Sequence, residues 1–133
     1  MKVLYCNPSF WEYRLPFYVE LNRLFNGDFH ILYSTRYFMS KHHKLLDEIK
    51  KEFGDNAHPY NNETVFDFKT RSFSKYQEGD KSISIPTALW GMISKIKPDV
   101  LITEGFFQWT PIVQLYGLIH HIPVFMGYER TLY

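Results

Sequence analysis

Aromatic, acidic and basic residues gather in three short segments, and each segment follows an apolar run that is typical of a buried strand. The segments are 7–14, 104–109 and 127–131. Their members that could do chemistry are Trp11, Glu12, Arg14, Glu104, Trp109, Glu129 and Arg130. Aromatic rings stack on the CH faces of sugars, and fixed charges bind hydroxyl or phosphate groups. The mixture therefore predicts a saccharide site; the alternative is that the tryptophans pack locally and the charged groups face solvent.

Other kinds of site find no support in the sequence. Segment 7–11 (Asn-Pro-Ser-Phe-Trp) stands where a dinucleotide-binding turn has its Gly-x-Gly-x-x-Gly motif. A Walker A lysine motif and a Gly-x-Ser-x-Gly nucleophile elbow are both absent from the sequence. The histidine pairs 42–43 and 120–121 are adjacent, so on a helix their rings point about 100° apart and chelate a metal poorly. We therefore expect neither a metal site nor a cofactor.

The elements expected to position these segments alternate between strand and helix. Short apolar, β-rich runs predict strands at 3–6, 29–33, 100–103 and 122–126. Apolar residues at helical spacing predict helices at 13–25, 41–53 and 86–97, and a last helix that begins at Gln108 or Thr110 and ends at 120–121. A proline is tolerated in the first turn of the first and last. The alternation predicts an α/β fold: a single-domain, Rossmann-like open parallel sheet of about five strands, with helices on both faces.

The predicted sheet brings the three segments together. In such a sheet, ligands bind beyond the carboxyl ends of the strands, near the point where the strand order reverses. We expect Arg14, Glu104 and Glu129 at this rim, in one cleft. We also expect segments 3–6, 98–104 and 122–126 to be central strands, nearly fully buried.

The middle of the chain, residues 54–82, is polar with scattered aromatic residues. It predicts a short strand near 65–68 followed by a loop. The loop is interpreted either as a long connection or as an excursion with a binding role.

Composition limits the class of protein. The 133 residues are 45% hydrophobic, 22% charged and 19% aromatic, with a formal net charge of +1. High apolar content with little net charge excludes a disordered chain, and fifteen Lys and Arg balanced by fourteen Asp and Glu disfavour a general nucleic-acid partner. The one cysteine, Cys6, rules out an intramolecular disulfide and is expected to be a buried strand residue. No apolar run approaches a membrane span, so we expect a cytoplasmic protein, with a peripheral position at a membrane as the alternative.

The sequence resembles the N-terminal, acceptor-side domain of GT-B glycosyltransferases, family 4 in particular. Residues 13–18 (Tyr-Arg-Leu-Pro-Phe-Tyr) resemble the first helix of these enzymes. Residues 97–105 (Lys-Pro-Asp-Val-Leu-Ile-Thr-Glu-Gly) resemble their Pro-Asp-Val strand. Residues 121–124 (His-Ile-Pro-Val) resemble the strand after the next helix, and 128–131 (Tyr-Glu-Arg-Thr) the segment behind it in some members. The resemblance spans roughly residues 1–131, without a detailed match in the middle.

The resemblance implies one half of a two-domain enzyme. Residues 1–133 would be the domain that binds a sugar or glycolipid acceptor, in an enzyme that transfers a sugar from a nucleotide-sugar donor. In the family the donor binds mainly the C-terminal domain, which carries a Glu-x7-Glu pattern and would lie beyond Tyr133. A nucleotide-sugar would therefore bind only with a second domain, and the isolated chain is expected to be inactive as a hexosyltransferase.

By the same resemblance, individual residues receive expected roles. Glu104 would orient the acceptor or act as the catalytic base. Arg14 or Arg130 would contact phosphate or a charge on the acceptor. Trp11 and Trp109 would shape the acceptor pocket, with Glu129 at the same cleft.

Two other functions remain open at this point. The chain is alternatively a non-catalytic module that docks on a partner subunit; in both cases an apolar face would be left bare for a donor-domain subunit or a second copy. The third hypothesis, a flavodoxin-like or response-regulator-like domain, is disfavoured. Regulators of that kind need an acidic cluster after the first strand, where 6–8 is Cys-Asn-Pro.

Overall fold

The computed structural model of the chain describes residues 1–9, 12–35, 43–61, 64–68, 71–74, 82–105 and 108–128. In this part of the chain a five-stranded sheet has the strand order β3-β2-β1-β7-β8. Its strands are β1 (Val3–Cys6), β2 (Phe29–Ser34), β3 (Ala57–Tyr60), β7 (Val100–Glu104) and β8 (Val124–Gly127). All neighbouring strands are parallel. The predicted open parallel sheet is therefore confirmed.

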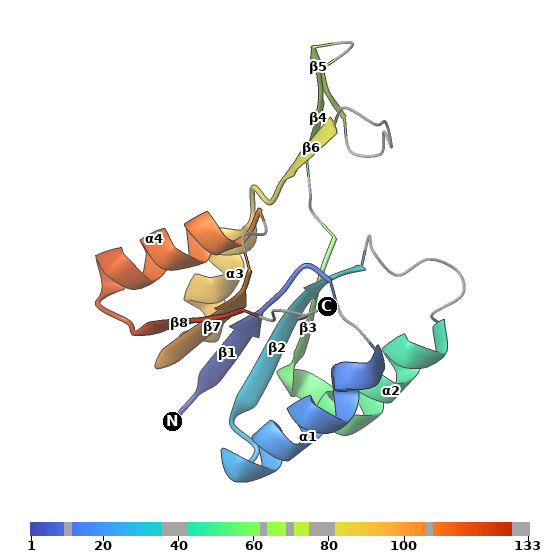
Figure 1. Ribbon diagram of the computed structural model, residues 1–133, viewed down its shortest axis with the longest axis vertical. Helices are drawn as coiled ribbons and strands as arrows, with labels where there is room; N and C mark the ends of the chain where they lie inside the picture. Colours follow the sequence, from blue (N-terminus) through green and yellow to red (C-terminus); the bar gives the residue numbers. More distant parts are fainter. Residues whose placement is uncertain are drawn as a thin grey trace, which may run out of the picture.

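Helices cover both faces of this sheet (Figure 1). They are α1 (Leu15–Leu24), α2 (His43–Phe53), α3 (Leu89–Ile96) and α4 (Thr110–His120), with 3-10 turns at Glu12–Arg14 (η1) and Gly54–Asn56 (η4). The side chains of Val3 and Tyr5 enter the core under α1 and α2, whereas those of Leu4 and Cys6 enter the core under α3 and α4. Because successive strand residues point to opposite faces, a strand buried on both sides reads as a continuous apolar run.

The order of the strands reverses between β1 and β7. From β1 the chain proceeds through β2 to β3 in one direction, and it later returns to place β7 on the other side of β1, followed by β8. This order differs from the flavodoxin-like arrangement, in which the second strand is at the edge. The carboxyl ends of β1 and β7 lie side by side at the reversal, because Cys6 pairs with Thr103. A ligand site is expected there.

The prediction that segment 122–126 is a central, nearly buried strand is wrong. The strand there, β8, pairs with β7 on one side only and forms an edge of the sheet. Phe125 is 60% exposed and Met126 44%. An apolar run indicates a strand. Whether other segments cover that strand depends on residues elsewhere in the chain.

The middle of the chain contains more structure than predicted. The expected short strand is confirmed as β4 (Thr64–Asp67), but β5 (Ser72–Ser74) and β6 (Ser82–Ile85) pair with it in a small antiparallel sheet in place of a loop. This sheet extends away from the carboxyl edge of the main sheet (Figure 1). The strand β3 was not predicted, because Pro59 interrupts its pattern; proline is tolerated there since β3 is an edge strand.

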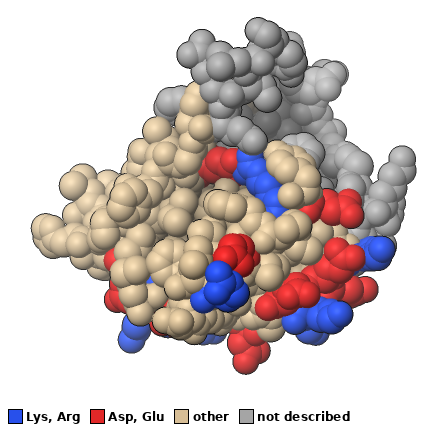
Figure 2. All heavy atoms as spheres, turned by 60° about the horizontal axis from the view of Figure 1, so that its bottom comes forward, with Lys and Arg blue, Asp and Glu red and all other residues tan. Residues whose placement is uncertain are grey.

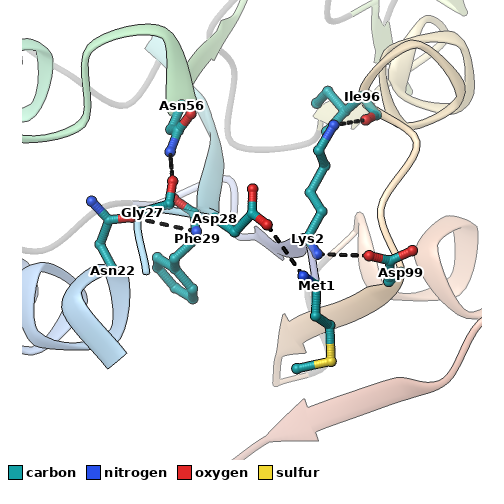
Figure 3. A network of polar contacts seen from close by, with 9 residues as sticks. All are labelled: Met1, Lys2, Asn22, Gly27, Asp28, Phe29, Asn56, Ile96 and Asp99. Atoms are coloured by element: carbon teal, nitrogen blue, oxygen red, sulfur yellow. Dashed lines mark hydrogen bonds and ion pairs between the residues drawn. The ribbon is translucent and has the colours of Figure 1, made fainter. Parts of the chain in front are cut away.

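Polar contacts tie the amino ends of the strands to neighbouring segments (Figure 3). The backbone N–H of Lys2 donates to Oδ2 of Asp99 at 2.7 Å, and its Nζ donates to the carbonyl oxygen of Ile96 at 3.0 Å. Ile96 is the last residue of α3, so the ammonium group lies at the negative end of the helix dipole. Asn56 Nδ2 donates to the carbonyl oxygen of Gly27 at 2.6 Å. These contacts hold the end of the sheet opposite the carboxyl edge.

Gly117 allows α4 to pack closely on β8, and this contact gives a stability prediction. A Cβ at this position would collide with Cγ2 of Val124 and come within 2.8 Å of the carbonyl oxygen of Ile122. We expect Gly117→Ala to lower the free energy of unfolding by about 1–3 kcal/mol, as overpacking does. Gly91 in α3 is the matched control, because a Cβ there meets nothing within 4 Å. Gly91→Ala should raise stability by about 0.5–1 kcal/mol through helix propensity.

Urea unfolding of the two variants checks the prediction. Equal effects of the two substitutions would contradict the close packing of α4 on β8.

Candidate functional site

A buried carboxylate stands at the carboxyl end of β7, beside the point where the strand order reverses. Glu104 accepts hydrogen bonds from the hydroxyl of Tyr5, at 2.5 Å, and from Nδ2 of Asn7, both on its Oε2. Its Oε1 pairs with Nη1 of Arg14, and the side chains of this ion pair are only 12% and 14% exposed. Residues 5–14 near the start of the chain therefore meet a carboxylate from about ninety residues later.

Local structure fixes each member of this network. Asn7 directs its amide nitrogen to Glu104 because its Oδ1 accepts hydrogen bonds from the backbone N–H of Ser9 at 3.0 Å and from the Ser9 hydroxyl at 3.2 Å. Arg14 ends η1 immediately before α1, whose first turn holds Pro16. Behind Glu104 the chain turns at Gly105, with φ at 60°, and Thr110 donates to the Gly105 carbonyl oxygen at 2.9 Å.

Two buried tyrosines lie under the ion pair. Tyr5 and Tyr18 contact each other with ring centroids 4.8 Å apart. Burial is the main cause that raises the pKa of both hydroxyls, and the hydrogen bond to Glu104 raises the pKa of Tyr5 further. Both hydroxyls are therefore neutral and keep their protons. They can donate hydrogen bonds, but they do not act as anionic nucleophiles near neutral pH.

A cavity of about 600 Å³ opens beside the ion pair, between α1 and the strands β7 and β8. Its described lining residues are Tyr5, Tyr13, Arg14, Phe17, Tyr18, Leu21, Ile102, Glu104, Gly127 and Tyr128. The rings of Tyr13, Phe17 and Tyr128 are each more than half exposed. The guanidinium carbon of Arg14 lies 5.5 Å from the centroid of the Tyr13 ring. The cavity thus combines exposed aromatic faces with one ion pair, and we call it the switch-point pocket.

The structure brings together only part of the residues singled out from the sequence. Arg14 and Glu104 form the ion pair and line the switch-point pocket. Trp109, expected to shape the pocket, is completely buried in the core under α3 and α4, where its ring meets Tyr60 edge-on at 5.3 Å. Trp109 therefore belongs to the core and is not among the described residues that line the pocket. Trp11, Glu129 and Arg130 lie outside the described residues.

Several lining residues escaped the sequence analysis. Tyr5 lies inside a buried strand, so its ring looked like core, and only the hydroxyl reaches the site. Tyr13 lies in η1 and Phe17 in the first turn of α1, so the two rings are four residues apart where the chain enters the helix, and both line the pocket. That spacing, next to a strand end, was the available signal. Asn7 had one too, because it directly follows β1.

Metal binding and membrane insertion gain no support from the described part of the chain. No group of three or more His, Cys, Asp or Glu side chains there could hold a metal ion. None of the described helices has the length and apolar character needed to cross a membrane. Cys6 is buried as predicted, and burial raises the pKa of its thiol.

Two histidines form a second titratable group, away from the switch-point pocket. Nδ1 of His30 on β2 and Nε2 of His58 on β3 are 2.9 Å apart, with the ring planes within 11° of each other. One ring donates its N–H and the other accepts it, so the accepting imidazole is neutral. Burial, followed by the proximity of His30 and of Lys2, lowers the pKa of His58 to about 4. Burial is also the main cause that lowers the pKa of His30.

This pair predicts loss of stability in weak acid. An unfolded histidine has a pKa near 6.5, so below that pH the unfolded chain binds protons that folded His58 refuses. The stabilisation that comes from a neutral His58 is complete above about pH 7. It is lost as the pH falls through about 6.5 toward 4. Because both rings are partly exposed, we expect a loss of about 1 kcal/mol between pH 7 and pH 5. The measurement is urea unfolding at a series of pH values.

A histidine substitution separates this effect from general acid titration. His58→Gln should flatten the pH dependence between pH 7 and pH 5. His121→Gln, at an exposed position after α4, should leave it unchanged. A wild-type profile that is already flat in this range would contradict the prediction.

Comparison of the chain with protein-family models, with curated proteins and with solved structures finds no match. The function is therefore argued from the pocket and its residues.

Proposed function

We propose that this chain is the acceptor-binding half of a glycosyltransferase and that the switch-point pocket holds a glycan or lipid-linked acceptor. The observation that carries the proposal is the composition of the pocket, in which exposed rings of Tyr13, Phe17 and Tyr128 surround the Arg14–Glu104 ion pair. Rings bind the CH face of a sugar, and charged groups hold its hydroxyls in one orientation. The position at the reversal of strand order supports a ligand site of this kind.

Within this proposal, the role of Glu104 is to orient the groups around the acceptor and not to remove a proton from the acceptor. A general base needs an oxygen that can approach the proton it takes. Both carboxylate oxygens of Glu104 already have partners in Tyr5, Asn7 and Arg14. We therefore assign Glu104 a positioning role: it holds the Arg14 guanidinium and the Tyr5 hydroxyl at the floor of the pocket.

Saturation-transfer NMR with a mixture of monosaccharides and short oligosaccharides tests the proposal. We expect saccharide signals for the wild-type chain and a strong loss in Phe17→Ala, which removes a pocket ring. Phe73 on β5 is the control, because it is also exposed and lies outside the residues that line the pocket. Phe73→Ala should bind like the wild type. No saccharide signal from the wild-type chain at millimolar ligand would overturn the proposal.

Donor binding gives a further prediction. The described pocket contains one guanidinium, already paired with a carboxylate. A hydrogen bond to a charged group contributes about 1–3 kcal/mol, whereas a micromolar complex requires about 8 kcal/mol. We expect the isolated chain to bind no nucleotide-sugar at micromolar concentration and to transfer no sugar. Calorimetric titration with a panel of nucleotide-sugars checks this, and micromolar binding would show that the donor site is in this chain.

A second candidate function, a non-catalytic module that docks on a partner subunit, has an observation of its own. On α4 the side chains of Leu115, Leu118 and Ile119 are exposed. On the edge strand β8, Met126 is exposed on the α4 side, near Gln114, whereas Phe125 is exposed on the opposite face of the sheet. The α4 sequence has no Lys, Arg, Asp or Glu. In Figure 2 most of the charged side chains lie on the right, on the side of α1 and α2. Exposed apolar surface next to an open strand edge is typical of an interaction site.

The two functions predict different results when a donor-binding subunit is added. The face formed by α4 and β8 would receive a donor-domain subunit or a second copy of the chain. Light scattering of wild type and Leu118→Lys measures whether this face forms a homodimer. If a purified donor-binding subunit restores sugar transfer, the glycosyltransferase function is supported; a stable complex without turnover supports the docking module.

A further inference from the structure

The charged groups of the switch-point pocket cancel each other. Among the described lining residues, Arg14 and Glu104 are the two charged side chains, and they are paired with each other. The remaining described walls are tyrosine, phenylalanine, leucine, isoleucine and glycine. The pocket therefore offers no uncompensated positive charge from these residues.

The ion pair is also firmly held from below. The oxygen of Glu104 that does not face Arg14 accepts hydrogen bonds from Tyr5 and Asn7, so the carboxylate is held in place. Asn7 is itself fixed by Ser9. An incoming phosphate or carboxylate would have to compete with this anchored carboxylate for Arg14 and would lie close to a like charge. It would also lose much of its hydration against aromatic walls.

Binding of a neutral polyol involves no competition with Glu104 for Arg14, no repulsion between like charges and no desolvation of a charge. A hydroxyl both donates and accepts hydrogen bonds, so it can join the tyrosine hydroxyls and the guanidinium without displacing Glu104. Its CH face can stack on Tyr13, Phe17 or Tyr128, whose rings are each more than half exposed at the pocket. Stacking of this kind depends on an apolar face and not on charge.

We infer that the switch-point pocket selects a neutral saccharide over an anionic one, because Glu104 neutralises Arg14 within it. The inference rests on the proposed function and specifies the substrate class of the same site. It also changes the role expected for Arg14: its guanidinium binds hydroxyl groups of a neutral sugar in place of a phosphate or another acceptor charge.

Three probes that share one ring test the inference on the wild-type chain: methyl glucoside, glucuronate and glucose 6-phosphate. NMR titration at pH 7 should give an affinity for methyl glucoside at least about fivefold above that for either anion. The affinity for methyl glucoside should not change between low and high salt, because no net charge is neutralised on binding. A preference for either anion that weakens with salt would overturn the inference.

The variant Glu104→Gln provides a second test of the inference. It keeps a side chain of similar shape but leaves the Arg14 charge uncompensated, so the affinity for glucose 6-phosphate should rise about fivefold or more relative to wild type. An unchanged affinity for glucose 6-phosphate in a well-folded variant would overturn the inference. If the variant does not fold, the salt dependence of the wild-type titrations still decides.

The outcomes separate this inference from the proposed function. Binding of anionic sugars in preference to neutral ones overturns the neutral class but leaves a saccharide site in the pocket. Failure of all three sugars, together with failure of the saccharide mixture, overturns both.

Discussion

Glu104→Ala is expected to lower the free energy of unfolding by about 2–4 kcal/mol and to abolish the binding of neutral saccharides. Removal of one member of a buried ion pair leaves the other charge without compensation, which is among the most destabilising single changes. In this chain the change would also leave the hydroxyl of Tyr5 and the amide of Asn7 without their acceptor. Because the paired side chains are 12% and 14% exposed, water screens them little, and the loss should be large.

Glu20 provides a matched control on the surface of α1. It pairs with Arg23 at 2.5 Å, but these side chains are 53% and 70% exposed. An exposed pair contributes little, so Glu20→Ala should leave the free energy of unfolding nearly unchanged. Urea unfolding of both variants compares the same chemistry in two environments.

A double substitution tests the physical cause. In Arg14→Gln/Glu104→Gln no charge is left unpaired, so this variant should be more stable than the sum of the two single substitutions predicts. Additive effects, or a Glu104→Ala variant as stable as Glu20→Ala, would mean that the ion pair is solvated and does not organise the pocket.

The meeting of Arg14 and Glu104 was predictable from the sequence for a definite reason. Arg14 follows β1 and Glu104 is the last residue of β7, and parallel strands end at the same edge. The pairing of β1 with β7 then brings the two ends together. The contribution of Tyr5 was not predictable in the same way, because a tyrosine inside a buried strand shows only an apolar ring in its pattern.

The errors have physical causes that a local pattern does not contain. Segment 122–126 has the apolar run of a central strand, yet β8 lies at an edge, because nothing among the described residues pairs with its outer side. In β3 the opposite occurred: Pro59 suppressed the strand pattern, although an edge position accepts it. Whether a strand is central or at the edge is decided by pairing between distant segments and not by the residues of the strand.

The placement of Trp109, five residues after Glu104, was also not predictable from the local sequence. Glu104 points to the α1 side, where it meets Tyr5, whereas Trp109 enters the core under α3 and α4. The turn at Gly105 and the hydrogen bonds of Thr110 with Thr103 and the Gly105 carbonyl separate the two side chains. A loop residue that follows a strand in the sequence can therefore belong to either face.

Trp109→Ala should be as destabilising as the loss of Glu104, with no direct effect on the pocket. The ring is completely buried and contacts Tyr60, so its removal leaves a cavity and should lower the free energy of unfolding by about 3–5 kcal/mol. Trp90 is the matched control: it is only partly buried, against Tyr116 and His120. Trp90→Ala should therefore have a clearly smaller effect in the same urea experiment.

Trp109→Phe separates packing from the polar atom of the ring. The indole Nε1 is buried and has no hydrogen-bond partner among the described residues, so part of the gain from burying the ring is offset by the desolvated N–H. Phenylalanine loses some contacts but removes that N–H. We expect a loss of about 1–2 kcal/mol, much less than for alanine. If Trp109→Ala also abolished saccharide binding while the variant remained folded, Trp109 would belong to the pocket after all, as the sequence had suggested.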